Sequence, residues 1–179
     1  MTMPIKNPEV FFSIDRDALK ILSEKGKSDP NTVKTVSCTT IAEGKRFRHL
    51  SYIRDLEAYV VDEPQGALGD NTAPNPLEAL LAALGSCPAV GIQANVISKG
   101  GAISAIQIEL EGGTITSGVW GTGNLSPKPL GLSSIRIKVH LEAGGLSENE
   151  LTELVHHAAK WSPVLNTIQN SVQVSISEF

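Results

Sequence analysis

Cysteine is scarce in this sequence. Its 179 residues include only Cys38 and Cys87, which do not form a CxxC motif. A disulfide framework and a cysteine zinc site are therefore excluded. In a reducing compartment the two residues matter only as thiols. Cys38 falls in a stretch rich in Thr and Val, where a small buried side chain in a strand is the favoured interpretation over a reactive thiol.

The sequence also lacks an excess of positive charge. Its 15 Lys and Arg residues stand against 19 Asp and Glu residues, which gives a formal net charge of -4. This balance provides no basic surface for nucleic acid or anionic lipid. The first residues lack the basic patch, apolar core and cleavage site of an export signal. We therefore expect a cytoplasmic protein with no nucleic-acid or membrane partner, and we expect no metal and no cofactor.

One long stretch has no charge of either sign, because no charged residue occurs between Glu78 and Lys99. Apolar or small residues fall on all sides of a helix over residues 75–100, which is typical of a helix buried all round. Asn75 and Glu78 form a capping box at its start, and Pro76 suits the first helical position. A membrane span is the alternative by length, but glycine, proline and amide residues interrupt the segment. A small domain rarely encloses a helix alone, so we expect a second copy to cover one face.

The other patterns predict an α+β protein with mostly antiparallel sheets around this long central helix. We expect an N-terminal arm with a short helix at residues 1–31 and one domain at residues 32–179. Periodicity and turn residues place the elements of the domain. Strands are predicted at residues 32–41, 45–53, 56–61, 103–110, 133–142 and 172–176, and further helices at residues 147–161 and 164–170.

The glycine-rich residues 112–131 predict a long hairpin or flap that carries Trp120. A phosphate loop is excluded because no helix follows these glycines. Trp120 either covers an apolar pocket or packs on the sheet. His156 and His157 are adjacent on a predicted helix and so cannot share a metal ion as an i, i+4 pair could.

Cys87 is the strongest candidate for chemistry. It is followed by Pro88, which lacks an N–H group, so we expect the helix to bend or break there. If the helix breaks, Cys87 caps a new segment whose unpaired N–H groups favour the thiolate, whereas an apolar setting without a cation favours the thiol. An inert core cysteine is the competing interpretation.

Three stretches resemble the OsmC/Ohr family, the osmotically inducible protein C and organic hydroperoxide resistance proteins. They are residues 60–87, which include the run from Asn75 and Pro76 to Cys87, residues 89–112, and residues 156–174. The resemblance implies an intertwined homodimer with two long helices at its centre and two equivalent sites at the subunit interface. It also implies that a thiolate at Cys87 attacks a hydroperoxide and becomes a sulfenic acid. A second cysteine would then form a disulfide that an external dithiol reduces.

The resemblance further implies that an arginine and a glutamate assist the thiol. Arg46 matches the arginine best, with Lys45 or Arg48 as alternatives, and Glu78 is the candidate acid, although many peroxidase members carry the acid one position earlier. The chain departs from the family at Ser162, which stands where the second cysteine normally lies and cannot form a disulfide.

Two kinds of function follow from this pattern. The first is a dimeric OsmC-like protein that reduces small organic hydroperoxides with one thiol, Cys87, in a pocket that includes Trp120 and Ser162, and depends on an external dithiol. The alternative is a protein without catalysis, either a binder of a small apolar or electrophilic ligand or a purely structural dimer.

Overall fold

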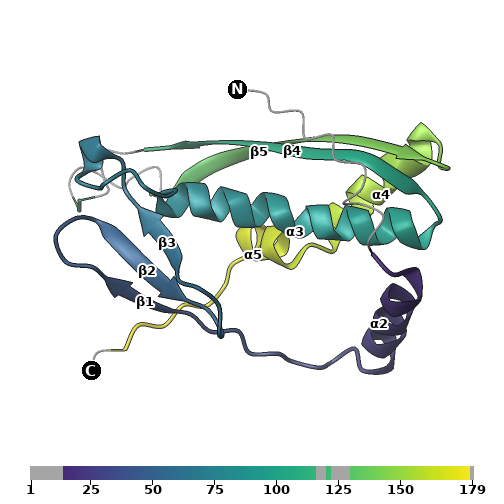
Figure 1. Cartoon of the computed structure of the whole chain (residues 1–179), viewed down its shortest axis with the longest axis horizontal. Helices are drawn as coiled ribbons and strands as arrows, with labels where there is room; N and C mark the ends of the chain where they lie inside the picture. The colour runs from purple at the N-terminus through teal and green to yellow at the C-terminus, as the bar shows by residue number, and fades with distance from the viewer. Residues whose placement is uncertain (1–13, 116–119, 122–129, 178–179) are drawn as a thin grey trace. The chain divides into compact units, whose positions relative to one another are not determined.

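A computed structural model describes residues 14–115, 120–121 and 130–177 of the chain. Figure 1 shows its helices and strands in chain order. The described residues divide into two compact units, one of residues 21–83 and the other of the remaining described residues. Helix α2 (Arg16–Ser28) confirms the helix predicted near the N-terminus. The Asp15 carboxylate starts this helix by accepting the backbone N–H groups of Asp17 and Ala18.

The unit of residues 21–83 contains a three-stranded antiparallel sheet in the order β1-β2-β3. Its strands are β1 (Thr39–Ala42), β2 (Arg48–Tyr52) and β3 (Tyr59–Asp62), followed by the short 3-10 helix η1 (Gln65–Ala67). The three predicted strands are confirmed, but the first begins seven residues later than expected. Residues 32–38 are therefore outside the sheet. Cys38 is exposed rather than buried in a strand, so that prediction is wrong.

The other unit is built on a long antiparallel hairpin of β4 (Ala102–Thr114) and β5 (Leu132–Gly144). One face of the hairpin is apolar and packs against a core formed by α3 (Pro76–Ser98) and α4 (Glu148–Lys160). The buried members of this core are Ile92, Val96, Ile103, Leu154 and Ala158. The other face carries cross-strand ion pairs, such as Glu111 with Arg136 at 2.8 Å. The hairpin thus alternates as the sequence predicted.

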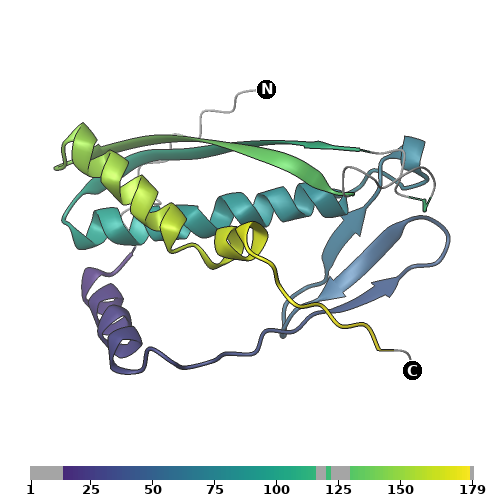
Figure 2. The same ribbon diagram turned by 180° about the vertical axis from the view of Figure 1, so that it is seen from behind.

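Small residues let α3 approach its neighbours closely. A Cβ atom added to Gly91 would lie 3.0 Å from the Cβ atom of Ala158 on α4, and one added to Gly85 would lie 2.7 Å from Cδ1 of Leu110 on β4. In both views of the ribbon, α3 runs along the β4–β5 hairpin, and Figure 2 shows α4 beside the end of α3 and the short α5 (Pro163–Gln169) beyond it. The glycines are therefore needed for packing at these positions.

Helix α3 confirms the predicted central helix. It continues through Pro88, so of the bend or break expected there the break does not occur. One chain does not bury it all round, because Val90 is 65 % exposed. A second copy that covers this face stays a prediction. Within the described residues it is the one helix whose length and composition would allow it to cross a membrane, and 33 % of its apolar window is buried.

The predicted strand at residues 172–176 is absent, because this segment has no strand partner within the described part of the chain. Its alternating residues Val172, Val174 and Ile176 are 58 %, 81 % and 93 % exposed. The predicted hairpin region begins and ends in strand, since β4 extends to Thr114 and β5 starts at Leu132. Residues 116–119 and 122–129 of that region lie outside the described residues.

Candidate functional site

The structure brings Cys87 and Ser162 together. Cys87 lies on α3 and is partly buried, while Ser162 lies between α4 and α5 and is 3 % exposed. The Ser162 hydroxyl donates a hydrogen bond to the Cys87 sulfur, with 3.1 Å between Oγ and Sγ. Two residues that are 75 positions apart in the sequence, and that were both selected from it, therefore meet.

Ser162 is held in place because it caps a helix. Its Oγ atom accepts the backbone N–H of Leu165 at 3.2 Å, and Pro163 occupies the first helical position of α5. Asn166 fastens the turn between α4 and α5, since its Nδ2 atom donates to the carbonyl oxygens of Lys160 at 2.9 Å and Ser162 at 2.8 Å. The hydroxyl thus reaches Cys87 from a turn with fixed geometry.

The continuous helix changes the expected environment of the sulfur. Because α3 does not break at Pro88, Cys87 does not cap a new segment, and no helix N-terminus is directed at it from α3. Of the hydrogen bonds in the described part of the chain, the one that reaches the sulfur comes from Ser162. The polar group that contacts the thiol is therefore a neutral hydroxyl that interacts better with a thiolate than with a thiol.

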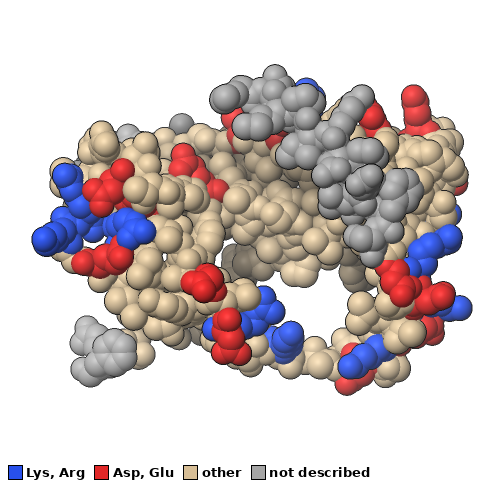
Figure 3. Space-filling model, viewed as in Figure 1, with Lys and Arg blue, Asp and Glu red and all other residues tan. Residues whose placement is uncertain are grey.

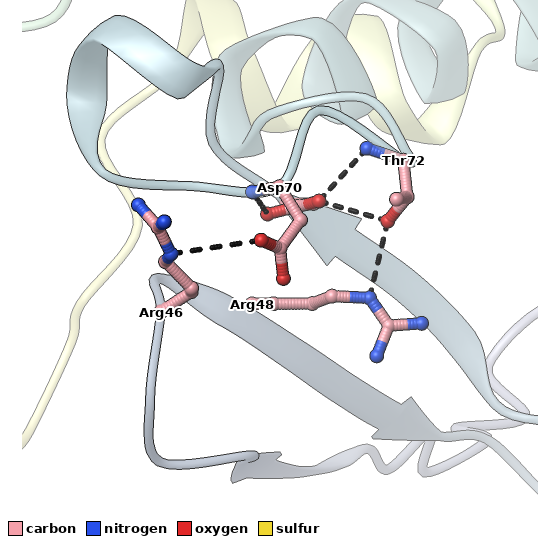
Figure 4. A network of polar contacts seen from close by, with 5 residues as sticks. Arg46, Arg48, Asp70 and Thr72 are labelled. Atoms are coloured by element: carbon pink, nitrogen blue, oxygen red, sulfur yellow. Dashed lines mark hydrogen bonds and ion pairs between the residues drawn. The ribbon is translucent and has the colours of Figure 1, made fainter.

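The candidate cations lie in the unit of residues 21–83, around β2 (Figure 4). Arg48 forms an ion pair with Glu43, and its Nε atom donates to Oγ1 of Thr72 at 3.1 Å. Arg46 has a looser partner, with 3.6 Å between its Nε atom and Oδ1 of Asp70, and its side chain is 51 % exposed. Ion pairs that are this exposed contribute little stability. The Arg48 guanidinium is thus held by Glu43 and Thr72, whereas the Arg46 guanidinium is held only loosely by Asp70.

The same network contains a buried acid that the sequence analysis did not single out. Asp62, at the end of β3, is 1 % exposed, and its carboxylate accepts the N–H groups of Asp70 and Thr72 and the hydroxyl of Thr72, at 2.8 to 3.0 Å. Burial alone would raise the pKa of Asp62, but these hydrogen bonds and one from the Glu63 N–H outweigh it and lower that pKa. Asp62 therefore fastens the loop that leads into α3. The signal available in the sequence was an aspartate at the boundary between a strand and a polar loop.

Glu78 lies at the start of α3, and Trp120 lies in the region between β4 and β5. Glu78 accepts the backbone N–H of Asn75 at 2.8 Å, and Oδ1 of Asn75 accepts the N–H of Glu78 at 2.9 Å. The predicted capping box is confirmed, and it occupies the Glu78 carboxylate. Trp120 is 64 % exposed. The participation of Arg46, Glu78 and Trp120 in a site with Cys87 stays a prediction.

Other features of the described residues can be compared with the Cys87 and Ser162 pair. Acidic and basic side chains are interspersed on the face shown in Figure 3. An open groove of about 500 Å³ lies between β5 and α4, and its lining residues, which include Val139 and Leu151, do not include Cys87. The described residues contain no group of three side chains suited to a metal ion. Cys87 with Ser162 is therefore taken as the candidate site among the described residues.

A family model described as "OsmC-like protein" matches residues 69–177, which is more than half of the chain and includes both Cys87 and Ser162. The chain belongs to the OsmC family. This membership confirms the resemblance noted in the sequence and makes α3 the core helix of a soluble fold rather than a membrane span. A comparison of this OsmC-family protein with the curated proteins finds no match.

Solved structures share the fold of this OsmC-family protein. An OsmC-like protein from Mycoplasma pneumoniae is 20 % identical over 77 % of this chain and 89 % of its own, with a TM-score of 0.64. The organic hydroperoxide resistance protein OsmC of Legionella pneumophila is 19 % identical over 78 % and 92 % (TM-score 0.51). The organic hydroperoxide resistance protein OhrB of Bacillus subtilis is 16 % identical over 77 % and 93 % (TM-score 0.52). These likenesses confirm the predicted α+β, OsmC-like fold, and the family match associates the chain with peroxiredoxin-like stress proteins.

Proposed function

We propose that this OsmC-family protein reduces organic hydroperoxides with Cys87 as its redox-active thiol. The observation that carries the proposal is the hydrogen bond of 3.1 Å from the Ser162 hydroxyl to the Cys87 sulfur. A donor directed at sulfur favours the nucleophilic thiolate over the thiol. Membership of the OsmC family supports the choice of substrate class.

The first step oxidises the sulfur by two electrons. The Cys87 thiolate attacks one peroxide oxygen, an S–O bond forms and the O–O bond breaks. The leaving alkoxide takes a proton from solvent and departs as an alcohol, and Cys87 becomes a sulfenic acid. Because Ser162 replaces the usual second cysteine, this sulfenic acid forms no disulfide within the pair.

An external dithiol then restores Cys87. Its first thiol condenses with the sulfenic acid, which forms a mixed disulfide and releases water. Its second thiol attacks the sulfur of the first, so that the dithiol leaves as a cyclic disulfide and Cys87 is released as the thiolate. A dithiol suits this chain because it supplies the second sulfur that Ser162 cannot.

A cation would assist the attack, and we propose Arg46 for this role. Its partner Asp70 is 3.6 Å away and both side chains are about half exposed, whereas Arg48 is held by Glu43 and Thr72. An Arg46→Ala variant should lose hydroperoxide turnover, and an Arg48→Ala variant should mainly lose stability. Equal turnover by wild type and Arg46→Ala would assign the cation elsewhere, with Lys45 as the next candidate.

We propose that the active form is a homodimer in the cytoplasm. The exposed Val90 on α3, at 65 %, supports a partner that covers this face, because large apolar groups on a core helix are normally buried. Both cysteines are unpaired, which suits a reducing compartment. Recovery of the native protein in a membrane or extracellular fraction would contradict the location.

The test of the function is consumption of an organic hydroperoxide in the presence of dithiothreitol. We expect wild type to turn over, Cys87→Ser to lose turnover completely, and the matched variant Cys38→Ser to keep it, because Cys38 is exposed and is not the thiol that receives the Ser162 hydrogen bond. Equal turnover by wild type and Cys87→Ser would refute the proposal. A protein that binds the hydroperoxide without consuming it would support the non-catalytic alternative.

A further inference from the structure

The Ser162 hydroxyl hydrogen has a single acceptor within the described part of the chain. The Oγ atom already accepts the Leu165 N–H, so its own hydrogen is the group that points to the Cys87 sulfur. The backbone of Ser162 is engaged as well, since its N–H donates to Ala159 at 3.2 Å and its carbonyl accepts the Asn166 N–H at 3.0 Å. Each polar atom of Ser162 therefore has a partner, and the hydroxyl orientation is determined.

Burial of Ser162 strengthens the hydrogen bond from its hydroxyl to the Cys87 sulfur. Ser162 is 3 % exposed, so water competes poorly for the hydroxyl hydrogen. A hydrogen bond to an ionised acceptor is stronger than one to a neutral acceptor, so the contact stabilises the thiolate of Cys87 more than its thiol. A serine at this position supplies that donor and, unlike a cysteine, cannot be oxidised to a disulfide.

We infer that Ser162 is a positioning residue that activates the Cys87 sulfur through its hydrogen bond and keeps the oxidised form of Cys87 open to external thiols. The first half concerns only the thiol and can be tested without a peroxide. The second half rests on the proposed function. Ser162 thus replaces the second cysteine of the family pattern with a residue that activates the sulfur but does not bond to it.

The test measures alkylation of Cys87 by iodoacetamide in a Cys38→Ser background, at one neutral pH and without hydroperoxide. Ser162→Gly should slow alkylation by about tenfold, because it removes the donor to a charged group, while glycine still serves as a helix cap. Ser162→Ala should slow alkylation as well, whereas Ser162→Thr should keep the wild-type rate of alkylation, because threonine keeps the hydroxyl. An unchanged or faster rate in both Ser162→Gly and Ser162→Ala would overturn the inference.

Ser147→Gly is the matched control. Ser147 caps α4 as Ser162 caps α5, accepting the N–H of Glu150, whereas the hydrogen bond to the Cys87 sulfur comes from Ser162. We expect it to alkylate at the wild-type rate. If Ser147→Gly slows alkylation as much as Ser162→Gly, or if Ser162→Thr is as slow as Ser162→Gly, the effect is structural and the inference fails.

A second measurement separates this inference from the proposed function. After one equivalent of hydroperoxide without reductant, the wild-type sulfenic acid should be trapped by dimedone at Cys87. Absence of the trapped product together with slower alkylation in Ser162→Gly would refute hydroperoxide reduction and leave the thiolate contact standing. Normal trapping with unchanged alkylation would refute the role of Ser162 and leave the function standing.

Discussion

Replacing Ser162 by cysteine should create a disulfide that the natural chain cannot form. The Oγ atom of Ser162 lies 3.1 Å from the Cys87 sulfur, and a carbon–sulfur bond is longer than a carbon–oxygen bond, so the new sulfur would start closer still. A disulfide requires about 2.05 Å between the sulfurs, with the two side chains facing each other. The side chains at positions 87 and 162 already face each other, so little backbone movement is needed.

The magnitude follows from the length of the closed loop. The two positions are 75 residues apart, and for a loop of that length the chain-entropy relation gives about 4.5 kcal/mol of stabilisation. In the reduced state the cysteine caps α5 poorly, which costs about 1 kcal/mol. We therefore expect reduced Ser162→Cys to be less stable than wild type, and the oxidised form to be more stable than wild type.

The assay is urea unfolding of Ser162→Cys in the Cys38→Ser background, before and after oxidation with an organic hydroperoxide, at one protein concentration. Titration of free thiols should show that two thiols per chain disappear on oxidation and return with dithiothreitol. If oxidised protein keeps both thiols, or if its unfolding midpoint does not rise above that of the reduced form, Cys87 and residue 162 do not lie as the structure places them.

Three further predictions test other parts of the fold. Gly69→Ala should lower the free energy of unfolding by about 2 kcal/mol or more, because its Cβ atom would overlap the Glu63 carbonyl, whereas the control Gly66→Ala, with open space around it, should change it by less than about 0.5 kcal/mol in urea unfolding. Hydrogen bonds lower the pKa of Asp62 in the folded state, so the stability that the Asp62 carboxylate contributes is complete above the unfolded pKa near 3.8 and is lost as the pH falls through the lower, folded pKa. The unfolding midpoints of wild type and Asp62→Asn should therefore converge in acid. A gap between the two midpoints that stays constant with pH would refute this. Val90→Glu should convert the dimer to a monomer in light scattering while Val90→Ala does not, and a monomeric wild type would contradict the proposed assembly.

Helix boundaries were predictable because their determinants are local. The capping boxes at Asn75 and Ser147 each involve residues three positions apart, and both form as the sequence indicated. A bend or a break was expected at Pro88, and the helix does not break there, because the lost hydrogen bond is a local cost that tertiary packing can offset. Pro88 is buried and lies between the fully buried Leu84 and Ile92, so packing on this side of α3 offsets the lost hydrogen bond.

Strands were less predictable because alternation describes side chains and does not identify a partner. Residues 172–176 alternate as a strand should, but within the described part of the chain no other strand pairs with them, and Val174 and Ile176 are left exposed. The same holds for residues 32–38, where Val33 and Val36 are exposed. The alternating pattern therefore described the order of apolar and polar side chains in these segments but did not predict whether they pair with another strand.

The family resemblance indicated that Ser162 lies near Cys87, but the local sequence around either residue did not, because the contact depends on how closely α3 approaches α4. Two contacts join these segments, one between Gly91 and Ala158 and the other between Cys87 and Ser162. Gly91 lies four residues after Cys87, and Ala158 lies four residues before Ser162, so the two contacts are about one helical turn apart. The opposite directions of these offsets mean that the chain segments run antiparallel here. Because Gly91 has no side chain, α3 can lie close to α4 at Ala158. One turn further along, the same close packing brings the Ser162 hydroxyl to the Cys87 sulfur. A larger residue at position 91 would therefore separate Ser162 from Cys87 without altering either residue.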